Sequence, residues 1–247
     1  TDSNKLESQK NVVKVEDVRI AAGIACSNFY NFPQNKVKLI GITGTNGKTS
    51  TSTILKSILD AKNEKTIQIG TSGIKPTIEI NPGLTTPDIF DLYEILNYAV
   101  NENYKNVILE VSSHALSQRR IENIFFDITA FTNLTHDHLD YHETMDEYFS
   151  EKLKLFNLNK DNGSSVVMID DEYGKRIAEL NSNVKCISLK NEDADYFCTS
   201  YSINSFGLAG TLAWDSETLD FESKLIGSFN LENLTLAASI AIELNIS

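Results

Sequence analysis

The sequence predicts an α/β fold: a mostly parallel, P-loop-type sheet flanked by helices, with a small antiparallel β extension near the C-terminus. Three observations support this prediction. An apolar run at residues 37–42 leads through Gly44-Thr-Asn-Gly47 into a helical pattern that begins at Lys48. Strand and helix patterns then alternate as far as residue 189, as in βαβ units. Between Tyr196 and Leu225, short alternating runs indicate antiparallel hairpins.

The segments around the Gly44–Gly47 loop have distinct patterns. Residues 12–16 predict a short strand and residues 17–30 a helix, with Pro33 in a linker to the main domain. After the helix at Lys48, residues 66–69 predict a strand that runs into a loop containing glycine and proline. Thr86 is then expected to cap a helix whose first residue is Pro87.

The second half continues the alternation. Apolar runs predict strands at 107–111, 126–131, 166–169 and 185–189, and helical spacing predicts helices after residue 142 and at 172–180. In the antiparallel part we expect one turn at Gly207 and Gly210 and another at 214–218. The closing helix is expected to begin after the segment 227–233.

Composition limits the classes of partner. The 22 basic and 34 acidic side chains among 247 residues give a net charge of -12, which argues against non-specific nucleic-acid binding. A site for anions must then concentrate its few cations, and Lys48, Arg119 and Arg120 are the candidates. No apolar run is long enough to span a membrane, and the three cysteines are widely spaced. We therefore expect a reducing, cytoplasmic compartment. We also expect a monomer whose partners are small molecules, although composition does not establish either point.

The Gly44–Gly47 loop has the layout of a phosphate-binding loop. Glycines let the backbone approach phosphate oxygens, and backbone N–H groups at the helix N-terminus attract an anion. Lys48 supplies a positive charge, and the Thr49 hydroxyl is placed to reach a bridging magnesium ion. Ile42 stands where the strict P-loop pattern has glycine, so the loop is a variant form. The alternative is an ordinary Gly/Thr turn.

Glu110 lies inside an apolar strand pattern, where a carboxylate is unfavourable unless it is paired or bound to a metal. Ligands of open α/β sheets bind at the carboxyl ends of the strands. We therefore predict that Glu110 is a magnesium ligand facing the loop. A paired structural carboxylate is the alternative.

The segment 132–142 is rich in histidine and aspartate. His138 and His142 are one helical turn apart, so a zinc site is a competing interpretation, although no third ligand has zinc-like spacing. On its own, Lys152 in the helix that follows would be interpreted as a solvated surface lysine.

Five segments, in order, resemble the Mur ligases, the ATP-dependent amide-forming enzymes of peptidoglycan synthesis, and in particular the central ATP-binding domain of the MurE-type branch. The P-loop form is shared with all Mur ligases and with folylpolyglutamate synthetases, whereas the segments that begin at Glu110 and at Phe131 are more specific to the MurE-like branch. The segments are Thr43-Gly-Thr-Asn-Gly-Lys-Thr49, Thr85-Thr-Pro87, Glu110-Val-Ser-Ser-His-Ala-Leu-Ser-Gln-Arg-Arg120, Phe131-Thr-Asn-Leu-Thr-His-Asp-His-Leu-Asp-Tyr-His142 and Gly227-Ser-Phe-Asn-Leu-Glu-Asn233.

The resemblance implies a reaction and a set of roles. The reaction adds the third amino acid to UDP-MurNAc-L-Ala-D-Glu through an acyl phosphate, with ATP and Mg²⁺. Lys152 takes the place of the family's carbamylated lysine. The implied catalytic residues are Lys48, Asn133, His138 and Lys152; nucleotide is held by Gly44, Thr45, Asn46, Gly47, Lys48, Thr49, Ser50 and Asn233; the UDP-linked substrate by Thr85, Thr86, Ser112, Gln118 and Arg120; and metal by Thr49, Glu110, His138 and Lys152.

The resemblance also implies a domain organisation. Residues 1–33 correspond to the tail of an N-terminal UDP-binding domain plus a linker, and residues 34–247 to the central ATP-binding domain. The family's C-terminal domain, which selects the amino acid, has no counterpart in the sequence. We therefore expect this chain alone to bind nucleotide weakly and to form no amide. The amino acid that is added does not follow from the sequence.

Three other functions compete with a MurE-type ligase. A sibling Mur ligase or a folylpolyglutamate synthetase-like ligase shares the P-loop. A non-catalytic nucleotide-binding module could keep the fold and lose the chemistry, although Lys48, Glu110, His138 and Lys152 are all present. A phosphohydrolase is the third alternative, but no residue is obviously placed to activate water.

Overall fold

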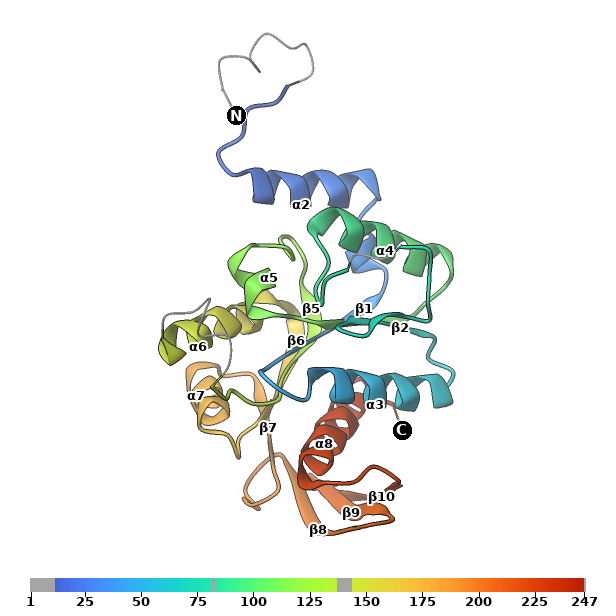
Figure 1. The fold of residues 1–247 in the computed structure, drawn as a ribbon, viewed down its shortest axis with the longest axis vertical. Coiled ribbons are helices and arrows are strands. Elements are labelled where there is room, and N and C mark those ends of the chain that lie inside the picture. The colour runs from blue at the N-terminus through green and yellow to red at the C-terminus, as the bar shows by residue number, and fades with distance from the viewer. Residues whose placement is uncertain (1–11, 81–82, 137–143, 247) are drawn as a thin grey trace.

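The computed structural model describes residues 12–80, 83–136 and 144–246. Across these residues the strands form one sheet in the order β10-β9-β8-β7-β6-β5-β1-β4-β2-β3 (Figure 1). The strands are β1 (Lys38–Thr43), β2 (Thr66–Gly70), β3 (Gly73–Lys75), β4 (Asn106–Glu110), β5 (Phe126–Phe131), β6 (Asn159–Met168), β7 (Val184–Ser188), β8 (Tyr196–Asn204), β9 (Gly207–Trp214) and β10 (Glu217–Ser223). The helices are α2 (Val18–Phe29), α3 (Lys48–Ala61), α4 (Ile89–Asn101), α5 (Ser113–Ser117), α6 (Met145–Leu153), α7 (Glu172–Leu180) and α8 (Ser228–Glu243), with short 3₁₀ helices η1 (Pro33–Asn35) and η2 (Lys154–Leu158).

The central strands are parallel, as the alternation of patterns predicts. β1 pairs in parallel with β4 on one side and with β5 on the other. The parallel pairing continues through β6 and β7, whereas β9 and β10 are antiparallel. The predicted fold class is confirmed.

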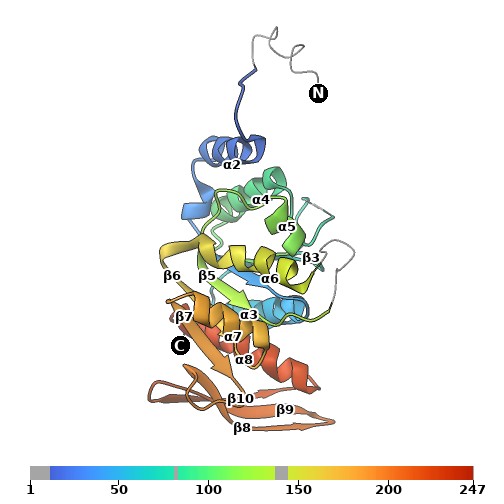
Figure 2. The ribbon, with the colours of Figure 1, turned by 90° about the vertical axis from the view of Figure 1, so that its left-hand side faces the viewer.

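Helices cover both faces of the sheet because the side chains of a strand alternate between its faces. On β1, Leu39 belongs to the core under α4, α6 and α7, whereas Ile40 and Ile42 belong to the core under α3 and α8. Figures 1 and 2 both show α4 on one side of the sheet and α3 with α8 on the other. This layering places the turn from β1 to α3 at the carboxyl edge of a buried sheet.

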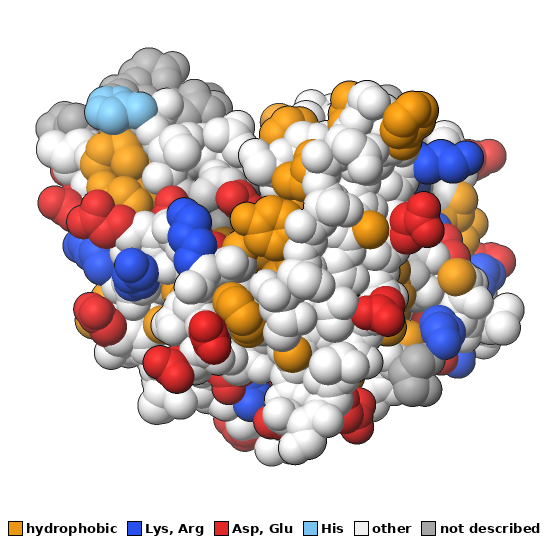
Figure 3. All heavy atoms as spheres, turned by 90° about the horizontal axis from the view of Figure 1, so that it is seen from below, with side chains coloured by type: hydrophobic (Ala, Val, Ile, Leu, Met, Phe, Trp, Pro, Cys, Tyr) orange, Lys and Arg blue, Asp and Glu red, His pale blue; other side chains and the backbone are white. Residues whose placement is uncertain are grey.

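The antiparallel extension, β8 to β10, lies at one end of the molecule and packs on α8 (Figure 2). Acidic, basic and hydrophobic side chains are interspersed over the face of the molecule seen from below in Figure 3. Gly210 lies in the middle of β9 and not in a turn, so that prediction was wrong. A Cβ at Gly210 would lie 2.6 Å from Cζ of Phe221, so glycine makes room for the Phe221 ring beside the strand.

Three other local predictions were wrong. Residues 12–16 form no strand: Val13 is 83% exposed, and no neighbouring strand supplies backbone partners. Helix α4 begins at Ile89 after Asp88, because the Thr86 hydroxyl donates to the Glu110 carbonyl oxygen (2.9 Å) instead of capping the helix. Helix α8 begins at Ser228, directly after Gly227 with its positive φ of 92°, and not after residue 233.

We expect Gly174→Ala to lower the free energy of unfolding by roughly 2 kcal/mol, after the better helix propensity of alanine is subtracted. Gly174 is buried on α7, and an added Cβ would lie 1.9 Å from the Met168 carbonyl oxygen. Urea unfolding followed by circular dichroism measures the change. Lys175→Ala, at the exposed neighbouring position, is the control and is expected to change stability by less than about 0.5 kcal/mol. Equal stability of the two variants would show that α7 can move away from Met168.

Candidate functional site

The loop between β1 and α3 depends on two glycines with positive φ. Gly44 has φ 146°, and a Cβ there would lie 1.9 Å from Oγ1 of Thr132. Gly47 has φ 85°, and its Cβ would lie 2.3 Å from Oδ1 of Asn233. Side chains from the ends of β5 and α8 therefore pack directly on the loop backbone. This is a cradle that only glycine permits at these two positions.

The residues that follow β5 hold the loop in place. The Asn133 carbonyl accepts from the backbone N–H of Thr45 (2.8 Å), and Oδ1 of Asn133 accepts from the N–H of Asn46 (3.0 Å). Thr132 Oγ1 donates to the carbonyl of Asn46 at 2.6 Å. Asn133, expected as a catalytic residue, thus lies against the loop and contacts its backbone.

Lys48 lies at the first turn of α3, and its Nζ donates to the carbonyls of Gly44 and Thr45, each at 2.9 Å. These contacts place the ammonium group across the loop. The adjacent Ser50 is half-buried on the same turn. The loop therefore combines open backbone geometry, a helix N-terminus and a cation, and it fits a phosphate group.

Glu110 is fully buried at the end of β4, beside Ile42 of β1. Its Oε2 accepts from Thr49 Oγ1 at 2.8 Å, and its Oε1 accepts from Ser52 Oγ at 3.2 Å. The Thr71 hydroxyl, at the end of β2, also donates to Oε2 (3.1 Å). A carboxylate beside the Thr49 hydroxyl is an oxygen donor set that suits Mg²⁺.

Lys152 is buried within the site. It is 1% exposed, its Nζ donates to the Gly44 carbonyl at 2.9 Å, and it lies 4.5 Å from the centre of the Tyr148 ring. The interpretation as a solvated surface lysine is therefore wrong. Helix α6 brings this amine to the same Gly44 carbonyl that Lys48 contacts, and the Tyr148 hydroxyl is 3.3 Å from Thr45 Oγ1.

The residues expected to bind the UDP-linked substrate form one connected group. The Thr86 oxygen accepts from the N–H of Ser112 at 3.0 Å, and Thr86 is fully buried. Arg120 donates from Nη1 to the Thr86 carbonyl (3.2 Å) and from Nη2 to Gln118 Oε1 (2.6 Å). Thr85 is half-buried beside them. Arg119 has left-handed φ and pairs with Asp17 (2.6 Å), so it is not part of this group.

Asn233 lies in the second turn of α8, where it is 5% exposed, and its Oδ1 accepts from Thr51 Oγ1 at 3.2 Å. It does not cap the helix, which begins at Ser228. Through Thr51 and Gly47 it connects α8 to the Gly44–Gly47 loop.

His138 and His142 lie outside the described residues, and so do the zinc alternative and the metal role expected of His138. The described part of the chain contains no cluster of three or more His, Cys, Asp or Glu side chains that could hold a metal. Within the same ranges, no helix is both long and apolar enough to cross a bilayer.

Gly70, Thr71, Ser52 and Thr132 were missed by the sequence prediction. All four contact Glu110 or the loop, or adjoin a residue that does. Gly70-Thr71 directly follows the strand predicted at 66–69, and the carboxyl ends of parallel strands meet at one edge of a sheet, so that position was the available signal.

Glu232, beside Asn233, carries a perturbed carboxyl group. Burial raises the pKa of Glu232 above its usual 4.5; the Asp170 carboxylate raises it further, Lys190 opposes the shift, and Asp171 adds to it. A raised pKa in the folded state means that stability is fully present below the unfolded pKa and is lost as pH rises through the folded pKa.

We therefore expect Glu232→Gln to stabilise the fold at pH 8, by up to about 1 kcal/mol because the group is only half-buried. The gain should shrink towards zero as the pH falls to 4.5. Thermal unfolding at several pH values measures it, and Glu222→Gln on the exposed face of β10 is the control. A gain that does not depend on pH would contradict the assignment of the effect to ionisation of Glu232.

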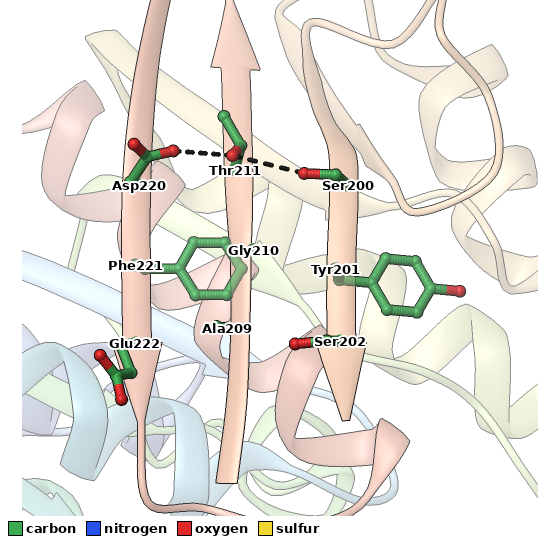
Figure 4. Close-up of a pocket in the computed structure, with 9 residues that line it drawn as sticks. All are labelled: Ser200, Tyr201, Ser202, Ala209, Gly210, Thr211, Asp220, Phe221 and Glu222. Carbon is green, nitrogen blue, oxygen red and sulfur yellow. Dashed lines mark hydrogen bonds between the residues drawn. The ribbon is translucent and has the colours of Figure 1, made fainter. Parts of the chain in front are cut away.

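A shallow cavity of about 650 Å³ lies on the β8–β10 extension (Figure 4). Across it, Ser200 Oγ donates to Thr211 Oγ1 (3.4 Å), which donates to Asp220 Oδ1 (2.7 Å). None of the residues expected at the site lines this cavity. The candidate site therefore lies at the carboxyl edge of β1, β4 and β5, apart from this cavity.

The profile of the family described as "Mur ligase middle domain" matches residues 42–241, which include the loop, Glu110, Lys152 and Asn233. The chain belongs to the Mur ligase family. Mur ligases in general use ATP and Mg²⁺, in agreement with the phosphate cradle and the oxygen donors.

Two curated Mur ligases illustrate the relationship. The UDP-N-acetylmuramoyl-L-alanyl-D-glutamate–2,6-diaminopimelate ligase of Caldanaerobacter subterraneus subsp. tengcongensis is 40% identical over 237 residues, covering 93% of this chain and 48% of the relative. The enzyme of the same name from Fusobacterium nucleatum is 38% identical over 250 residues, covering 99% and 50%. The chain thus spans about half the length of the curated relatives it matches.

A solved structure of a 2,6-diaminopimelate-adding ligase has the same fold. It superposes with a TM-score of 0.84 at 27% sequence identity, covering 97% of this chain and 50% of that one. The expected resemblance to Mur ligases of MurE type is confirmed.

Proposed function

We propose that this chain is the central ATP-binding domain of an amide ligase that adds the third amino acid to UDP-MurNAc-L-Ala-D-Glu. The observation that carries the proposal is the buried contact between Glu110 and Thr49 beside a glycine cradle. The names of relatives at 38–40% identity indicate the same reaction class. In this reaction the substrate carboxylate attacks the γ-phosphate of ATP, and the incoming amine then displaces phosphate from the acyl phosphate.

The residues of the loop have complementary tasks. The N–H groups at the N-terminus of α3 and the Lys48 ammonium bind phosphate oxygens and balance the charge that develops on the transferred phosphoryl group. Thr49 and Glu110 would hold Mg²⁺, which screens the phosphates. Asn133 keeps the loop in shape through its contacts with residues 45 and 46. Asn233 is proposed to approach the adenine.

Lys152 is proposed to act as a carbamate. Carbamylation replaces the ammonium group by an anion that can bind metal, with His138 as a second ligand. The carbamate keeps one N–H, which can still donate to the Gly44 carbonyl that Nζ now contacts at 2.9 Å. This step needs CO₂ and an unprotonated amine, and bound metal favours it.

Thr85, Thr86, Ser112, Gln118 and Arg120 are proposed to hold the UDP-linked substrate. Because Thr86 is buried and hydrogen-bonded within the protein, its task is to shape the segment. The half-buried Thr85 and Arg120 are the side chains placed to contact the substrate, with Arg120 as a forked donor to an anionic oxygen.

Residues 34–247 are proposed as the central domain of a longer ligase, with residues 1–33 as the tail of a UDP-binding domain and linker. The match to about half of each relative supports this division. We propose that the ligase acts as a monomer in the cytoplasm, on small molecules only, because its substrates are a nucleotide, a UDP-linked sugar peptide and an amino acid.

We expect the 247-residue chain alone to bind Mg·ADP weakly, with a Kd on the order of 1 mM, which is about 4 kcal/mol. Isothermal titration calorimetry with and without EDTA measures this. Binding should require Mg²⁺, because Thr49 and Glu110 contact the nucleotide through the metal. The proposal would be contradicted by the absence of binding at Mg·ADP concentrations several times this Kd, or by binding that EDTA does not weaken. ATP-dependent amide formation by this chain alone would contradict the division into domains.

A further inference from the structure

Glu110 has its position because of Gly70, the last residue of β2, and Thr71, which follows it. Gly70 is buried, and a Cβ there would lie 2.0 Å from Oε1 of Glu110 and 2.2 Å from its Cδ. No side chain larger than hydrogen is compatible with the observed carboxylate. The flexible end of Glu110 would have to leave the position in which it meets Thr49.

Thr71 donates hydrogen bonds to the Glu110 carboxylate, for which Gly70 leaves the space. The Thr71 hydroxyl donates to Oε2 of Glu110 at 3.1 Å, and the Thr71 backbone N–H lies 3.4 Å from the same oxygen. Thr49 donates to this oxygen from the opposite element, α3. Oε2 is therefore oriented from two sides, by β2 and by α3.

Thr71 also contacts the segment proposed to hold the UDP-linked substrate. Its Oγ1 lies 3.1 Å from Oγ1 of Thr85. A threonine hydroxyl has one proton, and an ionised carboxylate only accepts. Since Thr71 uses its proton on Glu110, the Thr85 hydroxyl must donate to Thr71. Thr85 then presents only lone pairs to a ligand and accepts from an N–H or O–H group.

We propose that Gly70-Thr71 is a positioning element that sets the Glu110 carboxylate for the metal and links it to Thr85. Gly70 and Thr71 act through Glu110 and have no catalytic role of their own. This inference rests on the proposed function and adds a connection between its metal and substrate groups. A ligand group that donates to Thr85 extends the chain of hydrogen bonds from Thr85 through Thr71 to Glu110, and so strengthens the contact that orients the carboxylate.

Binding of Mn²⁺ in the presence of ADP, followed by electron paramagnetic resonance on the 247-residue chain, tests the proposal. Partners that orient a metal ligand typically contribute 10- to 100-fold to metal affinity. We expect Thr71→Val to weaken Mn²⁺ affinity about tenfold and Gly70→Ala to weaken it more. Thr71→Ser keeps the hydroxyl and should restore the wild-type value. The control Thr211→Val, which also removes a hydroxyl that donates to a carboxylate, should have no effect.

The link to Thr85 has its own readout. Thr85→Val should weaken Mn²⁺ binding about threefold in the wild-type background and not at all in the Thr71→Val background. Independent losses in the two backgrounds would overturn the link.

Failure of the inference is distinguishable from failure of the proposed function. Wild-type binding of Mn·ADP with an unchanged affinity in Gly70→Ala and Thr71→Val would overturn the inference alone. A wild-type chain that binds no Mn·ADP would overturn the proposed function. In that case a crystal structure of ligand-free Gly70→Ala still decides the positioning claim: we expect the Glu110–Thr49 hydrogen bond to be lost, and its retention would overturn the claim.

Discussion

Replacing Lys152 by alanine in a ligase that contains this domain is expected to lower the rate of amide formation by on the order of 100-fold or more. The side chain is 1% exposed and contacts the Gly44 carbonyl, so its loss leaves a gap beside the phosphate-binding loop. If Lys152 is carbamylated, the variant also loses an anionic metal ligand. Steady-state assays of phosphate release and amide product measure the effect.

Added short carboxylates distinguish a packing role of Lys152 from a role as an anionic metal ligand. Formate or acetate is expected to restore part of the activity of Lys152→Ala, because it can supply the missing anion in the gap. Lys154→Ala is the matched control: this exposed lysine lies two residues after Lys152 and forms an ion pair with Glu151. An inactive variant that no carboxylate rescues would remove the carbamate from the account and leave a structural role.

In a ligase that contains this domain, Lys48→Met is expected to weaken Mg·ADP binding on the order of 100-fold, which is about 2.7 kcal/mol. The ammonium group lies across the loop on the carbonyls of Gly44 and Thr45, and no other described lysine contacts both. The loss should appear in affinity more than in stability, because these self-contacts are replaced by phosphate when nucleotide binds.

Lys56→Met is the control for this charge. Lys56 lies two turns further along α3 and pairs with Asp60, away from the loop. Comparison of the two variants in the same titration separates a local contact with phosphate from the general effect of removing one cation from an acidic protein. Equal affinities of Lys48→Met and Lys56→Met would contradict a phosphate-binding role for Lys48.

The sequence predicted best the features that have a local cause. Strand β5 matches residues 126–131 because its apolar run is bounded on both sides, and helix α7 matches 172–180 because its apolar spacing is regular and Asp171 caps it. Thr86 failed as a cap because a distant carbonyl, that of Glu110, takes its proton. Tertiary partners of this kind leave no local pattern.

The same contrast between local pattern and tertiary contact applies to the site. The glycine loop and Glu110 follow from spacing and from a charge in an apolar strand. Only the resemblance to a family predicted that Lys152 belongs to the site, since its own helix pattern suggests an exposed residue. The place of Gly70 and Thr71 after a predicted strand indicates the carboxyl edge of the sheet, but their contact with Glu110 depends on β2 lying beside β4, which the sequence pattern does not give.

Amide formation by a hybrid ligase tests the central claim most directly. In the hybrid, this chain replaces the matching half of the Caldanaerobacter ligase, and the assay contains ATP, Mg²⁺, UDP-MurNAc-L-Ala-D-Glu and a panel of amino acids. Mass spectrometry should detect a UDP-MurNAc-tripeptide with one diamino acid, dependent on ATP and absent with Lys152→Ala. A folded hybrid that binds Mg·ATP and the UDP-linked substrate but forms no amide with any amino acid would contradict the assignment as a ligase domain.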